Sequence, residues 1–81
     1  MSNLSKYQKT FQDSLSIKPE KFNENLKYNE IPEWDSIGHM KLFLEIEKKF
    51  QIKFDQDDIV SNLDYNSILS TLEIYLDEKN K

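Results

Sequence analysis

Apolar side chains near the start of the chain recur at steps of three and four residues, the spacing of one face of an amphipathic helix. This stripe consists of Leu4, Tyr7, Phe11 and Leu15. Ser2 or Asn3 is suited to cap the helix start, because a short polar side chain can accept from a free amide of the first turn. Lys18 should end the helix, since a residue before proline is pushed out of the helical region. We therefore predict a first helix over residues 3–16.

The stretch from residue 17 to residue 34 has no steady helical period. It contains Pro19 and Pro32 and many polar residues. We predict a long ordered loop here. The residues expected to pin it to the core are Phe22, Leu26, Tyr28 and Ile31. A connection longer than about 12–15 residues is uncommon in a compact domain unless it serves a function, so the segment that follows this loop is of particular interest.

That segment carries the clearest helix pattern. Asp35 is a good N-cap, so we predict a helix over residues 36–51. One apolar group on this helix consists of Leu42, Phe43, Ile46 and Phe50, and a second, well round the cylinder, of Ile37, Met40 and Leu44. If this helix buried only one face, the second apolar group would have no structural purpose. Either a second neighbouring element covers it, or it is an exposed patch to which a partner docks.

A short helix is predicted next, over residues 56–61. It follows an extended link that contains Ile52 and Phe54, and Asp55 is placed to cap its start. Its apolar contribution to the core consists of Ile59, Val60 and Leu63.

A last helix is predicted over residues 65–77, and Asp64 or Asn66 is placed to start it. Its apolar residues are Tyr65, Ile68, Leu69, Leu72 and Leu76. The polar tail from Asp77 should fray. A single glycine and the lack of Asn-Gly turns make hairpins improbable. We predict an all-α protein, a four-helix bundle with a long first loop and a short third helix, forming one domain over residues 1–81.

Composition excludes several classes of function. The chain has 81 residues and no cysteine, so it has no disulfide, thiolate zinc site or cysteine nucleophile. Its 11 cations are all lysine, against 15 Asp+Glu, and the net charge is −4, so we expect no nucleic-acid partner. No apolar run approaches the roughly 20 residues of a membrane span, and no signal-peptide core is visible. We expect a cytoplasmic monomer.

No self-contained catalytic or metal site stands out. The Asp55-x-Asp57 start of the short helix is unlike a calcium loop, because Val60 stands where that loop requires glycine. His39 follows Ser36 by one helical turn and could in principle activate its hydroxyl. No third group orients this pair, so a partly buried structural histidine is the better interpretation, and we expect no enzyme.

Ser36 is the first residue of the predicted helix, and the long loop delivers it to the surface. A hydroxyl there points outward from the helix start. A phosphate attached to it would lie at the positive end of the helix dipole, an arrangement worth roughly 0.3–1 kcal/mol.

At this point the chain resembles the acyl carrier protein family. The segment that carries the resemblance is Trp34-Asp35-Ser36-Ile37-Gly38-His39-Met40, which is similar to the family's Asp-Ser-Leu/Ile signature. The apolar and acidic pattern of the following helix and the short third helix are also similar, and the resemblance extends from about Leu4 to Leu76.

The resemblance implies that a phosphopantetheinyl transferase, using coenzyme A and magnesium, attaches 4′-phosphopantetheine to Ser36, and that Asp35 takes part in recognition by the transferase. It also implies that the terminal thiol of the arm carries an acyl group as a thioester, loaded by a ligase and processed by enzymes of a biosynthetic pathway. The residues that correspond to the family's partner-docking surface are Ile37, Met40, Leu44, Glu45 and Glu47.

The chain differs from the main fatty-acid carrier in its second helix, which carries Lys41, Lys48 and Lys49, and in Gly38, which stands where an acidic residue is common. These differences favour a dedicated pathway, for example for a lipid or a secondary metabolite. Two alternatives remain open: an aminoacyl carrier, such as a D-alanyl or peptidyl carrier, and an unmodified helical interaction module.

Overall fold

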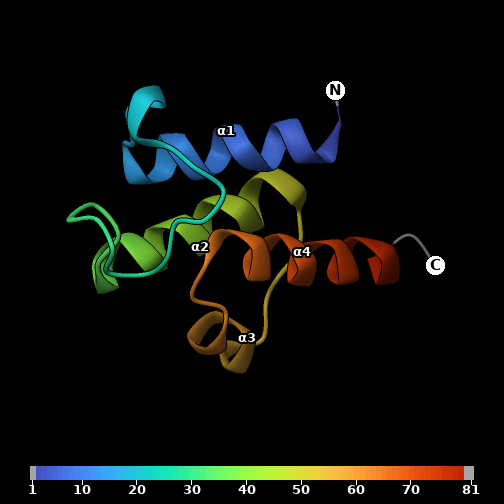
Figure 1. The fold of residues 1–81 in the computed structure, drawn as a ribbon. Helices are drawn as coiled ribbons and strands as arrows, with labels where there is room; N and C mark the ends of the chain where they lie inside the picture. The colour runs from blue at the N-terminus through green and yellow to red at the C-terminus, as the bar shows by residue number, and fades with distance from the viewer. Residues whose placement is uncertain (1, 80–81) are drawn as a thin grey trace.

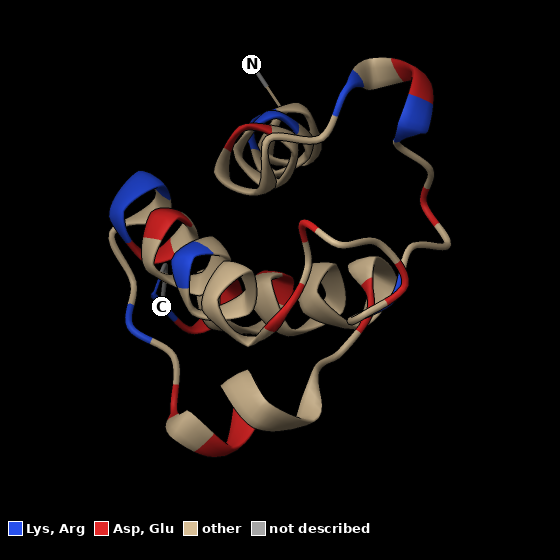
Figure 2. Ribbon diagram, turned by 90° about the vertical axis from the view of Figure 1, so that its left-hand side faces the viewer, with Lys and Arg blue, Asp and Glu red and all other residues tan. Residues whose placement is uncertain are grey.

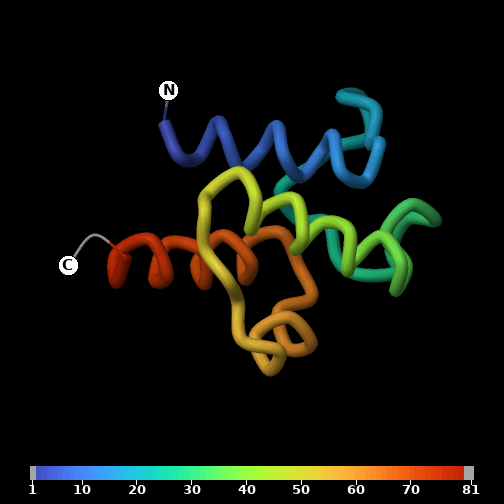
Figure 3. Tube along the Cα trace, turned by 180° about the vertical axis from the view of Figure 1, so that it is seen from behind, coloured from blue at the N-terminus to red at the C-terminus, as the bar shows by residue number. Residues whose placement is uncertain are grey.

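A computed structural model describes residues 2–79 and has four α-helices and one 3-10 turn. The elements are α1 (Asn3–Leu15), η1 (Pro19–Lys21), α2 (Ser36–Phe50), α3 (Gln56–Ser61) and α4 (Tyr65–Lys79). In Figure 1, α1 lies above α2 and α4, and α3 lies below them. Seen from behind in Figure 3, the start of α1 and the end of α4 lie at the same end of the molecule. The predicted all-α class and the four helices are confirmed for the described residues.

The core is built largely from aromatic rings. Phe11 of α1 lies at its centre, and its ring centroid is 5.1–6.0 Å from those of four other aromatic residues. These four residues are Tyr7, Phe22, Trp34 and Tyr65. Edge-to-face contacts of this kind add to the free energy gained by burying the rings. The core therefore ties the long loop, through Phe22 and Trp34, to α1 and α4.

The loop between α1 and α2 is ordered by its contact with the start of α4. Lys27 forms an isolated antiparallel bridge with Asp64. The four residues predicted to pin the loop do so, because Leu26 is buried and the other three pack partly buried against the core. The turn η1 was not expected; Pro19 at its first position suits a helical turn, since its fixed φ is already helical.

Helix α1 ends earlier than predicted and for a different reason. Ser2 caps its start by accepting from the N–H of Ser5 at 3.1 Å. At the other end Ser16 takes a left-handed conformation, with φ of 53°, so the helix stops at Leu15. The expectation that Lys18 ends the helix was wrong, because the chain has already turned two residues before it.

Helix α4 is longer than predicted. Asp64 begins it by accepting from the N–H of Ser67 at 2.6 Å. Fraying from Asp77 was expected, but the helix continues to Lys79. The Lys79 ammonium donates to the carbonyl oxygen of Phe50 at 3.0 Å, which ties this last turn to the end of α2. The remainder of the predicted tail, residues 80 and 81, lies outside the described residues.

Three residues expected in the core are exposed instead. They are Leu4 in the first turn of α1, Val60 in α3 and Leu63 after it. Leu4 lies near the end of the bundle, where the helical period continues but no neighbouring element covers it. The predicted cap of α3 is also wrong in one detail: Asp55 occupies the N-cap position, but its carboxylate makes no capping hydrogen bond.

Candidate functional site

The start of α2 is capped as the sequence predicts. The Asp35 carboxylate accepts from the N–H of Gly38 at 2.8 Å, and the Asp35 carbonyl oxygen accepts from the N–H of His39 at the same distance. Ser36 is the first helical residue and is exposed. Its hydroxyl makes no hydrogen bond with the described residues, so it is free to react or to be modified.

A buried tryptophan directly precedes this cap. The Trp34 side chain is fully buried, and its indole N–H donates to Nδ1 of His39 at 3.0 Å. The other ring nitrogen of His39 lies 2.7 Å from the carbonyl oxygen of Ile59 in α3. An indole can only donate, so Nδ1 must be the acceptor and Nε2 carries the proton that is donated to Ile59. His39 therefore connects the residue before the cap to α3.

These contacts decide between the two interpretations of His39. Its side chain is buried, and both ring nitrogens already have partners other than Ser36. Neither nitrogen is free to take a proton from the Ser36 hydroxyl. The interpretation of His39 as a structural histidine is confirmed.

Gly38 is required by a close approach between the loop and α2. A Cβ atom at this position would overlap the carbonyl oxygen of Glu33 and would come within 3.1 Å of the Leu15 side chain. Only glycine fits without moving the loop, which places Asp35 and Ser36. The sequence carried one signal of this contact, since Gly38 is the only glycine in the chain.

The second apolar group of α2 is exposed. Ile37 is 79% exposed, Met40 50% and Leu44 53%, so no neighbouring element covers this patch in the described part of the chain. Met40 also lines a groove between α2 and α3. The other residues of this groove are Glu47, Lys53, Phe54, Asp55, Gln56, Ile59 and Val60. Met40 joins the exposed patch to this groove, and the resulting surface begins at Ile37, next to Ser36, and contains charged residues beside the apolar ones.

The two glutamates expected to contact partners have different environments. Glu45 lies 3.8 Å from the ammonium of Lys48 on the same helix. Glu47 accepts from the N–H of Phe54 at 2.8 Å, which holds the link between α2 and α3. One carboxylate oxygen of Glu47 therefore already accepts a hydrogen bond within the fold. Figure 2 shows acidic but no basic positions on α3, so negative charge also lies beside the groove.

Helix α3 has no fully buried residue; Ile59 packs partly buried against the core, as predicted, and polar contacts supply the rest of its attachment. The Tyr75 hydroxyl of α4 donates to the Asp58 carboxylate at 2.5 Å and accepts from the N–H of Asp55 at 2.9 Å. Burial raises the pKa of Tyr75, and the hydrogen bond to Asp58 raises it further. Thr71 of α4 donates to Asn62, just after α3, at 3.0 Å.

Comparison with protein-family models, with curated proteins and with solved structures gave no match. No helix within residues 2–79 has the length and apolar character needed to cross a bilayer.

Proposed function

We propose that this chain is an acyl carrier protein whose Ser36 hydroxyl is the attachment point for 4′-phosphopantetheine. The observation that carries the proposal is the state of Ser36: an exposed hydroxyl without a hydrogen-bond partner in the described residues, at the capped start of α2. The backbone below it is held by a buried side chain, Trp34, and by the close approach at Gly38. A reactive group on a fixed, exposed backbone is what a modifying enzyme needs.

The residues at this position fit a phosphate ester. The N–H groups of Ser36 and Ile37 make no hydrogen bond with the described residues, because the Asp35 carboxylate occupies only the N–H of Gly38. Two free amides at a helix start favour an attached phosphate, by roughly 0.3–1 kcal/mol for the dipole alone. In the proposed step the Ser36 oxygen attacks the pantetheine-side phosphorus of coenzyme A. The hydroxyl proton passes to the transferase, and adenosine 3′,5′-bisphosphate leaves.

When bound, the arm would supply a terminal thiol that carries an acyl group as a thioester. This chain has no cysteine of its own, so any thioester chemistry requires such an imported thiol. The chain's own residues would hold the arm at Ser36 and present it beside the apolar surface of α2 and α3.

The exposed patch of α2 would bind the partner enzymes. Ile37, Met40 and Leu44 offer apolar contacts, and the acidic residues of α3 and Asp35 suit a basic partner. A small patch with charge beside it favours fast and weak association, because electrostatic steering raises the on-rate without a large buried area. A carrier that visits a transferase, a loading ligase and processing enzymes in turn needs such contacts.

The test of the attachment is intact-mass measurement after incubation with coenzyme A, magnesium and a phosphopantetheinyl transferase of broad specificity. The wild-type chain should gain one arm, and Ser36→Ala should gain none while keeping its free energy of unfolding within about 0.5 kcal/mol. A folded wild-type chain that gains no mass would contradict the proposal and favour an unmodified interaction module. Loading assays with ATP, candidate ligases and labelled acids would then separate an acyl from an aminoacyl carrier.

The test of the docking surface compares two substitutions with the same charge change. Met40→Glu should reduce the kcat/KM of modification by about tenfold, since a carboxylate would be desolvated in the apolar patch. Ile74→Glu is the control, because Ile74 is also exposed but lies on α4. Both variants should keep their helical circular-dichroism spectrum. Equal rates for the two variants would show that the α2 patch does not contact the transferase.

A further inference from the structure

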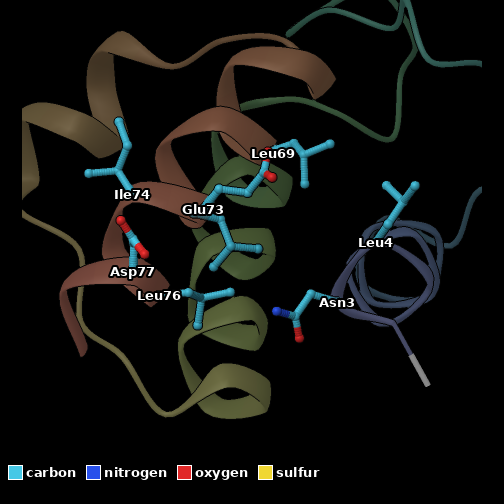
Figure 4. A pocket seen from close by; sticks show the side chains of 8 residues that line it. Asn3, Leu4, Leu69, Glu73, Ile74, Leu76 and Asp77 are labelled. Atoms are coloured by element: carbon cyan, nitrogen blue, oxygen red, sulfur yellow. The ribbon is translucent and has the colours of Figure 1, made fainter. Parts of the chain in front are cut away.

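A second apolar groove lies on a different face of the molecule, between the start of α1 and the C-terminal half of α4. Its lining includes Leu4, Leu69, Leu72, Glu73, Leu76 and Asp77. Figure 4 shows Leu69, Glu73 and Leu76 on the side of α4 that faces α1, with Asn3 and Leu4 opposite them. Leu4 is 50% exposed, although it continues the apolar stripe of α1. The stripe therefore extends beyond what the fold itself covers.

The groove combines an apolar floor with acidic charge. Leu72 is buried at its base, and Leu69 and Leu76 are partly buried. Glu73 and Asp77 are exposed and stand one helical turn apart on α4, and neither forms an ion pair within residues 2–79. The lining runs from residue 69 to residue 77 of α4, about 12 Å at 1.5 Å per residue, or roughly two helical turns.

We propose that this groove binds an amphipathic helix of a separate protein, with an apolar stripe two turns long and lysine or arginine beside it. The apolar floor and the Leu4 wall would take the stripe, and Glu73 and Asp77 would pair with the cations. The charge of the groove disfavours the other occupants. A second copy placed groove to groove would bring the same two carboxylates against each other, and an anionic amphiphile, nucleic acid or anionic bilayer would be repelled.

This binding is independent of the proposed modification of Ser36, which lies on another helix. A partner held here would leave the apolar surface of α2 and α3 open. The groove would thus hold one partner stably, while the α2 patch binds other enzymes transiently.

The experiment uses three blocked 14-residue peptides that share one leucine stripe at helical spacing and differ in the flanking residues: lysine, glutamine or glutamate. Binding is measured by fluorescence anisotropy and mapped by amide chemical shifts on the folded chain. The lysine peptide should shift the amides of the groove residues and should bind at least tenfold more tightly than the glutamine peptide. The glutamate peptide should bind least.

Variants locate the site. Leu4→Asn should weaken binding of the lysine peptide by about tenfold. The double variant Glu73→Gln with Asp77→Gln should weaken this binding by a similar factor. The double variant Glu20→Gln with Glu30→Gln makes the same change in net charge in the loop between α1 and α2 and should bind as the wild type does. Ser36→Ala should also bind normally, so failure of the carrier proposal would leave this result unchanged.

The following results would overturn the proposal. The first is equal loss of binding in the two double variants, which would show that net charge alone attracts the peptide. The second is a set of shifts that maps to α2 and α3, or no binding by any peptide. The third is self-association of the chain alone in sedimentation, abolished by Leu4→Asn, which would assign the groove to a second copy.

Discussion

The start of α2 and helix α3 both face solvent, but they are held in different ways. The start of α2 rests on Trp34, which is fully buried, and on the close contact of the loop at Gly38. Helix α3 has no fully buried residue. Ile59 packs partly buried against the core, hydrogen bonds to Tyr75 and His39 attach the helix, and Thr71 bonds Asn62 just after it.

This difference has consequences for motion. Burial of a large aromatic side chain resists local opening, whereas a hydrogen bond that water can replace contributes only about 0.5–1.5 kcal/mol. We therefore expect α3 to open more readily than the start of α2, which keeps Ser36 fixed while one wall of the neighbouring groove can move. His39 belongs to both regions, since it bonds Trp34 on one side and Ile59 of α3 on the other.

The largest expected effect comes from removing the buried Trp34 side chain that supports the start of α2. Trp34→Ala should lower the free energy of unfolding by about 3–5 kcal/mol, because it leaves a large cavity and an unpaired nitrogen on His39. Urea denaturation followed by circular dichroism measures this loss. Trp34→Phe is the control, since it keeps most of the buried aromatic volume but not the hydrogen bond to His39. Its loss in free energy of unfolding should be clearly smaller. Losses below about 1 kcal/mol for Trp34→Ala would refute the role assigned to this side chain.

Gly38→Ala tests the close approach of the loop. The added methyl group must displace the Glu33 carbonyl, which should cost about 1–3 kcal/mol of stability. Alanine would otherwise be the better helix former by about 1 kcal/mol, so a destabilised variant is informative. Met40→Ala, in the same helix but half exposed, provides the reference. A Gly38→Ala variant more stable than the wild type would show that the loop moves aside freely.

Tyr75→Phe tests the polar attachment of α3. It removes the hydrogen bonds to Asp58 and to the N–H of Asp55 while keeping the ring packed on Phe54. At about 0.5–1.5 kcal/mol for each of the two hydrogen bonds, the global loss should be about 1–3 kcal/mol. Hydrogen exchange should speed up for the amides of α3 but not for those at the start of α2. Faster exchange at both places to the same degree would remove the distinction between the two regions.

The smallest effect concerns pH. Burial raises the pKa of Tyr75 above its ordinary value of 10.0, with a further rise from Asp58. Above about pH 10 the unfolded chain releases this proton and the folded chain keeps it, so folding stability falls as pH rises. Tyr75→Phe lacks this contribution, and its stability should fall less steeply than that of the wild type between about pH 9 and 11. Burial also raises the pKa of Tyr7, so part of the slope should persist in the variant. Equal slopes of folding stability against pH in the wild type and in Tyr75→Phe would contradict the raised pKa of Tyr75.

The helices could be predicted from the sequence to within one or two residues because their signals are local. Periodic apolar positions and the Asp35 cap were enough to locate α2 and to place Ser36 at its start. The second apolar group of Ile37, Met40 and Leu44 could also be recognised from the sequence, but only the structure decided that no neighbouring element covers it.

The exceptions show the limit of local pattern. Leu4 and Val60 carry the right spacing and residue type for burial, yet both are exposed, because burial depends on whether another element reaches that end of the molecule. Trp34 was missed as a core residue since it lies in a loop without a helical period. The last turn of α4 was expected to fray, but a contact with Phe50 holds Lys79.

The amino-acid sequence by itself determined the all-α class, the four helices and a serine at a capped helix start. Only the tertiary structure decided that Trp34 is buried, that His39 bonds Ile59 rather than Ser36, and that α1 and α4 leave an acidic, apolar groove between them. The physical reason is the distance along the chain over which each interaction acts. Helical periodicity and capping depend on residues within one turn, whereas a hydrogen bond between residues 20 positions apart depends on the path of the loops and on how the helices pack.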